Sequence, residues 1–201
     1  PKARKAGPDG GEPLETPLGF GKLAEIVVLK GISMNVLVTG GAGYVGSATV
    51  RTLVAAGHQV WVYDNLCAGH RGAVPEGSLI EGDVRDRERL RRELVERRIE
   101  AVFHFAAFAY VGESVRDPGR SYARNVAGSL ALLEAMRAAG VSQIVFSSTT
   151  ATYGTPSRIP ISEDEAQQPI NPYGFTKLIV ERALADYAAA YGFSYAALRY
   201  F

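Results

Sequence analysis

The sequence has few of the features on which secreted, membrane-spanning or nucleic-acid-binding proteins depend. Its 201 residues include a single cysteine, Cys67, so no disulfide can form within the chain, which fits a reducing compartment such as the cytoplasm. The 22 basic and 21 acidic residues nearly cancel, so the net charge of +1 gives no overall attraction for nucleic acid or an anionic membrane. No apolar run reaches the roughly 20 residues that a transmembrane helix needs. We therefore expect neither nucleic acid nor a membrane as a partner.

Residues 1–33 differ in composition from the rest of the chain. They hold many glycines and prolines without a sustained period, and the apolar segment 23–32 is too short and too interrupted by charge for a secretory signal. Met34 stands directly before the first β-branched run and fits a natural start. We expect residues 1–33 to be a disordered leader outside the fold, and residues 34–201 to form one domain.

After residue 33, short β-branched runs alternate with longer helical stretches. This alternation is typical of an α/β protein whose parallel sheet is covered on both faces. Strands are predicted at 35–39, 59–63, 78–81, 101–105, 143–147 and 194–198, and helices at 44–56, 87–98, 118–139 and 172–191. The expected fold is a doubly wound parallel sheet of the Rossmann type.

A glycine-rich turn with the sequence TGGAGYVG, residues 39–46, follows the first predicted strand. Glycine lets the backbone turn tightly and approach a diphosphate, while the helix that begins near Tyr44 points free N–H groups at that charge. Such a turn can be a simple connection, but its position between strand and helix, with Asp64 ending the second strand, favours a dinucleotide site. The Asp64 carboxylate accepts from ribose hydroxyls and repels a 2′-phosphate, so the sequence predicts NAD rather than NADP.

Tyr173 and Lys177 are four residues apart in the last predicted helix, so the phenol and the ammonium lie on one face. A cation beside a phenol stabilises phenolate, and a group with a usual pKa of about 10 can then act as a base near neutral pH. Thr149 follows the fifth predicted strand, at the edge where a doubly wound sheet binds ligands. We assign its hydroxyl to bridge the substrate oxygen and Tyr173. The pattern predicts removal of a proton from a sugar alcohol while a nicotinamide takes the hydride.

Other polar residues near strand ends have a structural as well as a functional interpretation. Asp83 follows the third predicted strand, where a carboxylate can accept from the adenine amino group, whereas Asp86 is placed to cap the next helix. The three histidines have no metal-ligand spacing among themselves or with Cys67, so no metal is expected. His104 lies inside a predicted strand and is expected to be a hydrogen-bonded core residue.

An ordered series of short motifs runs along residues 34–201. The motifs are Thr39 to Gly46, Asp64-Asn65-Leu66, Gly82-Asp83-Val84-Arg85-Asp86, His104-Phe105-Ala106-Ala107, Val111-Gly112-Glu113-Ser114, Asn125-Val126, Phe146 to Gly154, Asn171-Pro172-Tyr173 and Leu198-Arg199-Tyr200-Phe201. With this series the chain resembles the extended short-chain dehydrogenase/reductases, and within them the UDP-glucose (UDP-galactose) 4-epimerases.

The resemblance implies a tightly held NAD, a UDP-sugar substrate, and a homodimer for the full-length enzyme. It implies that Tyr173 takes the proton from the sugar O4, that Lys177 lowers the pKa of Tyr173 and binds the nicotinamide ribose, and that Thr149 orients O4. Thr149 and Tyr173 are thus also the expected substrate-binding residues. The expected cofactor-binding residues are Gly40, Gly43, Tyr44, Val45, Gly46, Asp64, Asn65, Asp83, Val84, Phe105, Ala106, Ala107, Asn125, Ser147, Tyr173, Lys177 and Phe201.

The sequence departs from the family pattern in ways that leave alternatives open. Many of these epimerases carry a lysine near the cofactor where Ala109 stands, so one ribose or phosphate contact is in question. Segments 109–114, 149–154 and 169–173 also resemble the UDP-pentose (arabinose/xylose) 4-epimerases. The family continues beyond Phe201 into a smaller domain that binds the UDP, so we expect this chain to lack its substrate domain.

Two other functions compete with epimerisation. A nucleotide-sugar 4,6-dehydratase resembles this chain but carries an acidic pair after the catalytic threonine, whereas Thr150 and Ala151 follow Thr149 here. A non-catalytic NAD-binding fragment is the alternative from a different class. The presence of Thr149, Tyr173 and Lys177 favours an enzyme of epimerase ancestry.

Overall fold

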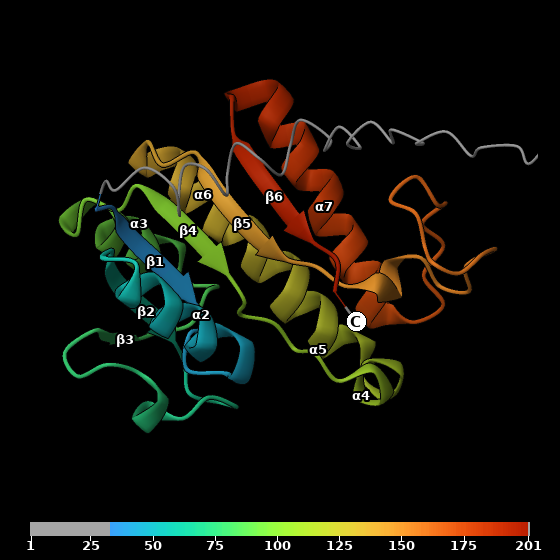
Figure 1. The fold of residues 1–201 in the computed structure, drawn as a ribbon, viewed down its shortest axis with the longest axis horizontal. Coiled ribbons are helices and arrows are strands. Elements are labelled where there is room, and N and C mark those ends of the chain that lie inside the picture. Colours follow the sequence, from blue (N-terminus) through green and yellow to red (C-terminus); the bar gives the residue numbers. More distant parts are fainter. Residues whose placement is uncertain (1–32, 201) are drawn as a thin grey trace, which may run out of the picture.

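The computed structural model describes residues 33–200, and six parallel strands form its single sheet in the order β3-β2-β1-β4-β5-β6 (Figure 1). The strands are β1 (Asn35–Thr39), β2 (Gln59–Asp64), β3 (Leu79–Glu81), β4 (Ala101–His104), β5 (Gln143–Ser147) and β6 (Ser194–Leu198). The chain builds the sheet outward from β1 to β3 and then crosses back to add β4 on the other side of β1. The predicted doubly wound parallel sheet is therefore confirmed, with its switch point between β1 and β4.

Helices cover both faces of the sheet, as the apolar pattern of the strands requires. On β1, Leu37 belongs to a buried cluster with residues of α3 (Arg87–Glu96), α6 (Gly128–Ala139) and α7 (Pro172–Tyr191). Its neighbours Val36 and Val38 point the other way, into a cluster with Val50 and Leu53 of α2 (Tyr44–Ala55). Alternate side chains of a strand project to opposite faces, so both faces of β1 are fully buried.

The helical segment between β4 and β5 differs from the predicted single helix over 118–139. It consists of α5 (Pro118–Ser121), a π-helical segment η2 (Tyr122–Ala127) and α6. A π-helical turn holds one extra residue, which changes the face on which the next side chains lie. A short helix that was not predicted, α4 (Val111–Arg116), precedes α5, and two short 3₁₀ turns, η1 (Arg71–Ala73) and η3 (Thr150–Thr152), complete the structure.

Most other predicted elements agree with the structure to within two residues at each end. The predicted leader lies outside the described residues apart from Ser33, whose hydroxyl donates to Gly57 O at 2.8 Å. Within residues 33–200, no helix combines the length and the apolar character needed to cross a membrane. Phe201, predicted to bind the cofactor, also lies outside the described residues.

Candidate active site

The glycine turn lies between the end of β1 and the start of α2. Gly40 has a φ of +72°, and a Cβ there would lie 2.4 Å from the backbone nitrogen of Ala106 in the segment after β4. A Cβ on Gly46 would lie 2.3 Å from Gly40 O, so the missing side chain allows α2 to pack onto the turn. No side chain caps the N-terminus of α2. Its first N–H groups are therefore available to an anion.

Asp64, at the end of β2, holds the loop that follows β2 against this turn. Its Oδ2 accepts from the backbone N–H of Ala42 at 3.0 Å, and its Oδ1 accepts from Leu66 N at 2.8 Å. The N–H of His70 donates to Ala42 O at 2.9 Å and ties the far end of the loop to the same residue. Each carboxylate oxygen retains acceptor capacity, so a ribose hydroxyl can still donate to Asp64.

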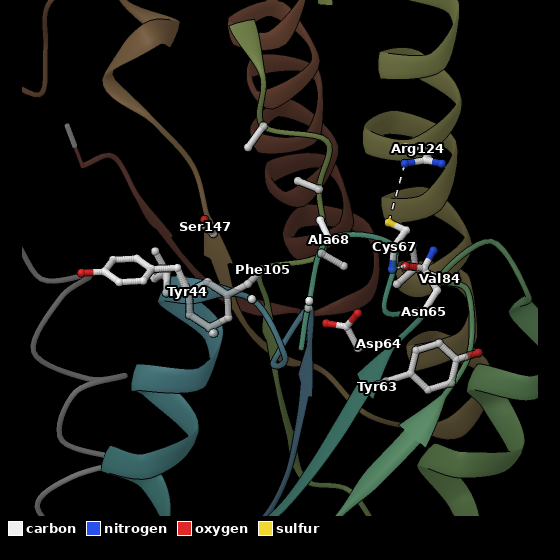
Figure 2. A pocket seen from close by; sticks show the side chains of 18 of the residues that line it. Tyr44, Tyr63, Asp64, Asn65, Cys67, Ala68, Val84, Phe105, Arg124 and Ser147 are labelled. Carbon is white, nitrogen blue, oxygen red and sulfur yellow. Dashed lines mark hydrogen bonds between the residues drawn. The ribbon is translucent and has the colours of Figure 1, made fainter. Parts of the chain in front are cut away.

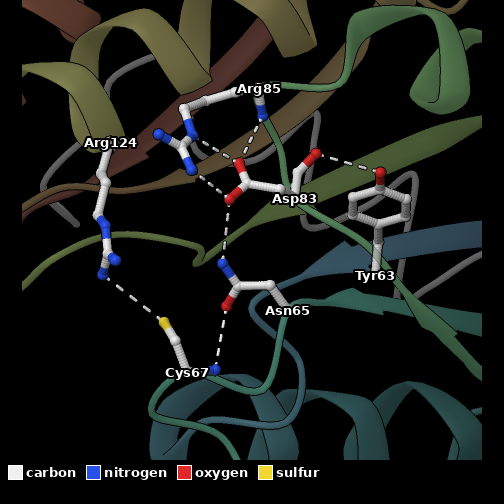
Figure 3. Close-up of polar contacts among 6 residues, drawn as sticks. All are labelled: Tyr63, Asn65, Cys67, Asp83, Arg85 and Arg124. Carbon is white, nitrogen blue, oxygen red and sulfur yellow. Dashed lines mark hydrogen bonds and ion pairs between the residues drawn. The ribbon is translucent and has the colours of Figure 1, made fainter.

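A polar network joins the ends of β2 and β3 beside Asp64 (Figure 3). Asn65 Nδ2 donates to Asp83 Oδ2 at 3.2 Å, and the Arg85 side chain donates to both carboxylate oxygens of Asp83, at 2.9 and 2.8 Å. These hydrogen bonds from Arg85 hold the pKa of Asp83 well below its usual range. The Tyr63 hydroxyl donates to Asp83 O at 3.1 Å. The carboxylate is therefore ionised and fixed in position.

A cavity of about 420 Å³ extends from the glycine turn toward the carboxyl end of β5 (Figure 2). The predicted cofactor residues that line it are Gly40, Gly43, Tyr44, Val45, Gly46, Asp64, Asn65, Asp83, Val84, Phe105, Ala106, Ala107, Ser147, Tyr173 and Lys177. Ala109 lines it as well. Asn125 and Thr149 do not belong to the lining. The structure thus brings residues from five of its strand ends and from α2 and α7 around one cavity.

Tyr173 and Lys177 reach this cavity from the first turns of α7. Asn171 caps that helix, accepting from Gly174 N at 2.8 Å, and Ser114 Oγ accepts from Tyr173 N at 3.2 Å. The Lys177 ammonium is fully buried, donates to Ser147 O at 2.6 Å and lies 5.9 Å from the centre of the Tyr173 ring. The predicted i, i+4 pair is therefore on one face and next to the end of β5.

Burial shifts the pKa values of both Tyr173 and Lys177. Burial raises the pKa of Tyr173 and outweighs a hydrogen bond with the Thr149 side chain, which lowers it. Burial also lowers the pKa of Lys177 to about 7, although the nearby Glu181 carboxylate raises it. Desolvation penalises the charged form of both groups, so burial is the largest cause of the pKa shift at each residue.

Thr149 approaches Tyr173 by its side chain, although it lies outside the cavity lining. It ends the segment that follows β5 and caps η3, accepting from Ala151 N at 3.1 Å. Its hydroxyl also contacts the Tyr173 side chain through the hydrogen bond that lowers the tyrosine's pKa. The three predicted catalytic residues therefore lie together at the end of β5.

A buried ionic network supports this corner of the site. Glu181, one turn after Lys177 on α7, accepts from Ser148 Oγ, from Gln167 Nε2 at 3.0 Å and from Arg199 Nη2 at 2.6 Å. Arg199 Nη1 donates in turn to the Tyr153 hydroxyl at 2.7 Å. The network connects α7 to the segment after β5 and to the end of β6, which fixes the residue before Thr149.

Asn125, a predicted cofactor-binding residue, is buried and holds the loop after β4. It is 2% exposed, and its side chain accepts from Phe108 N at 2.6 Å and donates to Phe108 O and Thr176 Oγ1, both at 3.0 Å. It belongs to the π-helical segment and connects this loop to α7. His104 is a satisfied core residue, as predicted, since its ring nitrogens pair with Thr39 Oγ1 at 2.6 Å and Ser129 Oγ at 2.8 Å.

Several residues line the cavity without having been predicted to do so. They are Tyr63, Cys67, Ala68, Gly69, Gly82, Tyr110, Arg124 and Tyr200. Cys67, Ala68 and Gly69 come shortly after Asp64 and Asn65 in the sequence, so proximity to predicted cofactor residues was an available signal. The sequence pattern did not indicate that Arg124 lines the cavity. Among residues 33–200, no group of three histidine, cysteine or acidic side chains is placed to hold a metal.

The geometry defines a Rossmann-type dinucleotide site joined to a tyrosine–lysine pair, and comparison with known proteins agrees. Residues 36–201 match the NAD dependent epimerase/dehydratase family, and the chain belongs to this family. It is 53% identical over 167 residues to a UDP-glucose 4-epimerase of Rhizobium meliloti, a match that covers 83% of this chain and 51% of the relative.

Two solved structures have the same fold at high identity. The UDP-glucose 4-epimerase of Brucella ovis in complex with NAD is 55% identical, with a TM-score of 0.82 over 84% of this chain and 52% of that one. The enzyme of Stenotrophomonas maltophila, with bound NAD and formylated UDP-arabinopyranose, is 43% identical, with a TM-score of 0.81 over 84% and 53%. The chain therefore spans about half the length of the relatives that it matches.

Proposed function

We propose that this chain is the NAD-binding domain, residues 34–201, of a UDP-glucose 4-epimerase that interconverts UDP-glucose and UDP-galactose, a reaction of galactose metabolism. The observation that carries the proposal is that Tyr173 and Lys177 line the same cavity as the glycine turn, with the Thr149 side chain hydrogen-bonded to Tyr173. A further domain would hold the UDP. The relatives named above support this reading of the substrate.

The residues of the cavity fit NAD. The uncapped N-terminus of α2 offers N–H groups to the diphosphate, and Asp64 offers acceptor oxygens to the adenosine ribose. The fixed, ionised Asp83 lies at the end of β3, where it can accept from the adenine amino group. Ser147 and Lys177 would hold the nicotinamide half at the end of β5. Bound NAD supplies the acceptor, and later the donor, of a hydride.

The chain's own residues handle the proton of the sugar hydroxyl. Tyr173 is the proton acceptor for O4, and Thr149 orients O4 through the hydroxyl that already contacts the phenol. A positive charge near the phenol lowers its pKa, because it stabilises phenolate. Lys177 is placed to supply this charge. Burial lowers the pKa of Lys177 to about 7, and the Glu181 carboxylate opposes this lowering and so favours the charged form. The 4-keto sugar then rotates in the site and presents its other face, and transfer of the proton back to O4 completes the reaction.

A UDP-arabinose/UDP-xylose 4-epimerase is the second candidate. The observation that favours it is the UDP-arabinopyranose derivative found on one close structural relative, together with the motif resemblance of segments 109–114 and 149–154. The catalytic residues would have the same roles in both cases, because both reactions invert C4.

Assay of the complete reading frame against UDP-galactose, UDP-glucose, UDP-arabinose and UDP-xylose decides between these functions. We expect the highest kcat/KM for the hexoses, and no elimination product, because neither Thr150 nor Ala151 has a carboxyl group that could act as general acid or base. Higher kcat/KM for the pentoses would establish the second candidate. A 4-keto-6-deoxy product would indicate a dehydratase, and complete inactivity with NAD bound would indicate a non-catalytic NAD-binding protein.

The full-length enzyme is expected to be a homodimer of the cytoplasm. Exposed apolar side chains on neighbouring helices support an interface, namely Val111 and Val115 on α4 and Phe175 on α7. The exposed free thiol of Cys67 fits a reducing compartment. Sedimentation of the full-length protein tests the dimer, which a monomer at micromolar concentration would contradict, and cell fractionation tests the location.

A further inference from the structure

Arg124 lines the cavity from the wall opposite α2 and has no role in the function proposed above. It comes from η2, and Figure 2 shows its side chain directed across the cavity toward Cys67, in the loop after β2. The next residue, Asn125, is anchored to Phe108 and Thr176 by three hydrogen bonds. The backbone at Arg124 is thereby fixed, so its side chain emerges at a defined position.

The hydrogen bond that Arg124 makes is a weak one. Its Nη1 donates to Cys67 Sγ at 3.7 Å, and a thiol is a poor acceptor. Within residues 33–200, Arg124 forms no ion pair, although its carbon Cζ lies 5.6 Å from the centre of the Phe108 ring. Arg85, nearby in Figure 3, instead makes two hydrogen bonds to the Asp83 carboxylate. Arg124 therefore keeps most of its capacity to bind an anion.

The side chains that line the cavity supply little positive charge for binding a diphosphate. The lining contains two cationic residues, Arg124 and Lys177, and Lys177 is committed to Ser147 O at the end of β5. Ala68, Gly69 and Ala109 also line the cavity and offer no side-chain donor. The N-terminus of α2 contributes only about half a positive charge, whereas a diphosphate carries two negative charges.

We propose that Arg124 is a cofactor-binding residue, whose guanidinium turns from the Cys67 thiol to the diphosphate of NAD and closes the cavity on the side opposite α2. A guanidinium is matched to phosphate oxygens because its N–H groups donate in a planar fork. The inference rests on the proposed binding of NAD.

Calorimetric titration of the chain with NAD and with ADP tests the proposal in three variants. Arg124→Gln keeps a polar side chain without charge, Arg124→Lys keeps the charge without the fork, and Arg182→Ala removes an exposed arginine on α7 whose ion-pair partner is Asp186. We expect the Gln variant to bind both ligands at least about tenfold more weakly, which corresponds to ~1.4 kcal/mol. The Lys variant should lie between the Gln variant and the unaltered chain, and Arg182→Ala should change nothing.

Unchanged binding of NAD and ADP by the Gln variant would overturn the proposal, provided that the unaltered chain binds NAD. Equal losses in the Lys and Gln variants would overturn it too, because the positive charge would then contribute nothing. If the unaltered chain binds neither NAD nor ADP, the proposed cofactor fails and the role of Arg124 fails with it. Circular dichroism of each variant verifies that the fold is retained.

Discussion

Substitution of Glu181 tests whether its buried ionic network with Arg199 stabilises the fold around the proposed catalytic residues. The carboxylate side chain is 7% exposed and pairs with Arg199, which is 24% exposed, at 2.6 Å. Removing one partner of a buried ion pair costs about 3–5 kcal/mol, because the other charge is left without compensation. Arg199 keeps its hydrogen bond to the Tyr153 hydroxyl and some contact with water. For Glu181→Gln we therefore expect a loss of about 2–3 kcal/mol in the free energy of unfolding.

Urea denaturation at pH 7, followed by circular dichroism, measures this loss. The matched control is Asp186→Asn on the same helix, since its pair with Arg182 has side-chain exposures of 63% and 77%. The control should cost less than about 0.5 kcal/mol, as exposed pairs do. If Glu181→Gln and Asp186→Asn were equally destabilising, the network would not support the site as described.

The effect of Glu181→Gln should also depend on pH in a predictable direction. Burial raises the pKa of Glu181, but hydrogen bonds from Arg199, Ser148 and Gln167 outweigh burial and lower it. A carboxylate whose folded pKa is below its unfolded value of about 4.3 contributes stability above that value and loses it as the pH falls. The difference between the variant and the unaltered chain should be complete at pH 7 and shrink below about pH 4. A difference that grew on acidification would contradict the assignment.

Three further predictions concern the turn, the lysine and the cofactor. Gly46→Ala should destabilise the chain by about 1–3 kcal/mol in urea and weaken NAD binding in calorimetry, because the added Cβ would lie 2.3 Å from Gly40 O; normal NAD affinity would contradict the role of the turn. The pKa of Lys177 is about 7 in the folded chain and 10.5 in the unfolded chain. At a pH between these two values, Lys177 is protonated mainly in the unfolded state. The free energy of unfolding should therefore rise from pH 7 to 9.5, and this rise should be smaller in Lys177→Met; identical pH slopes would refute the lowered pKa. The chain should bind NAD about tenfold more tightly than NADP, equivalent to ~1.4 kcal/mol. Asp64→Asn should reduce this difference in affinity. Equal affinities for NAD and NADP in the unaltered chain would rule Asp64 out as the discriminating residue.

The sheet and the main features of the site follow from local sequence patterns. Each β-branched run forms a strand near its predicted position, and the glycine turn and Asp64 lie beside one another because consecutive parallel strands end at the same edge. The i, i+4 spacing of Tyr173 and Lys177 also needed no tertiary information, because helical geometry sets it.

The features that the sequence did not indicate depend on tertiary packing. Arg124 and Asn125 are adjacent on η2, yet Asn125 is buried and hydrogen-bonded to Phe108, whereas Arg124 lines the cavity. Which segments pack against each face of η2 decides this difference, and the periodicity of 118–139 does not indicate it. Likewise the raised pKa of Tyr173 reflects burial contributed by many segments, which a spacing of four residues does not reveal.

The most direct test of the central claim follows a deuterium label at C4 of UDP-galactose in the full-length protein. If this chain is the NAD-binding domain of a 4-epimerase, the UDP-glucose formed should retain the deuterium at C4, with no net NADH. Tyr173→Phe, which removes the proton acceptor and little of the cavity, should give no product yet still bind NAD. Accumulation of labelled NADH, or full turnover by Tyr173→Phe, would contradict the account.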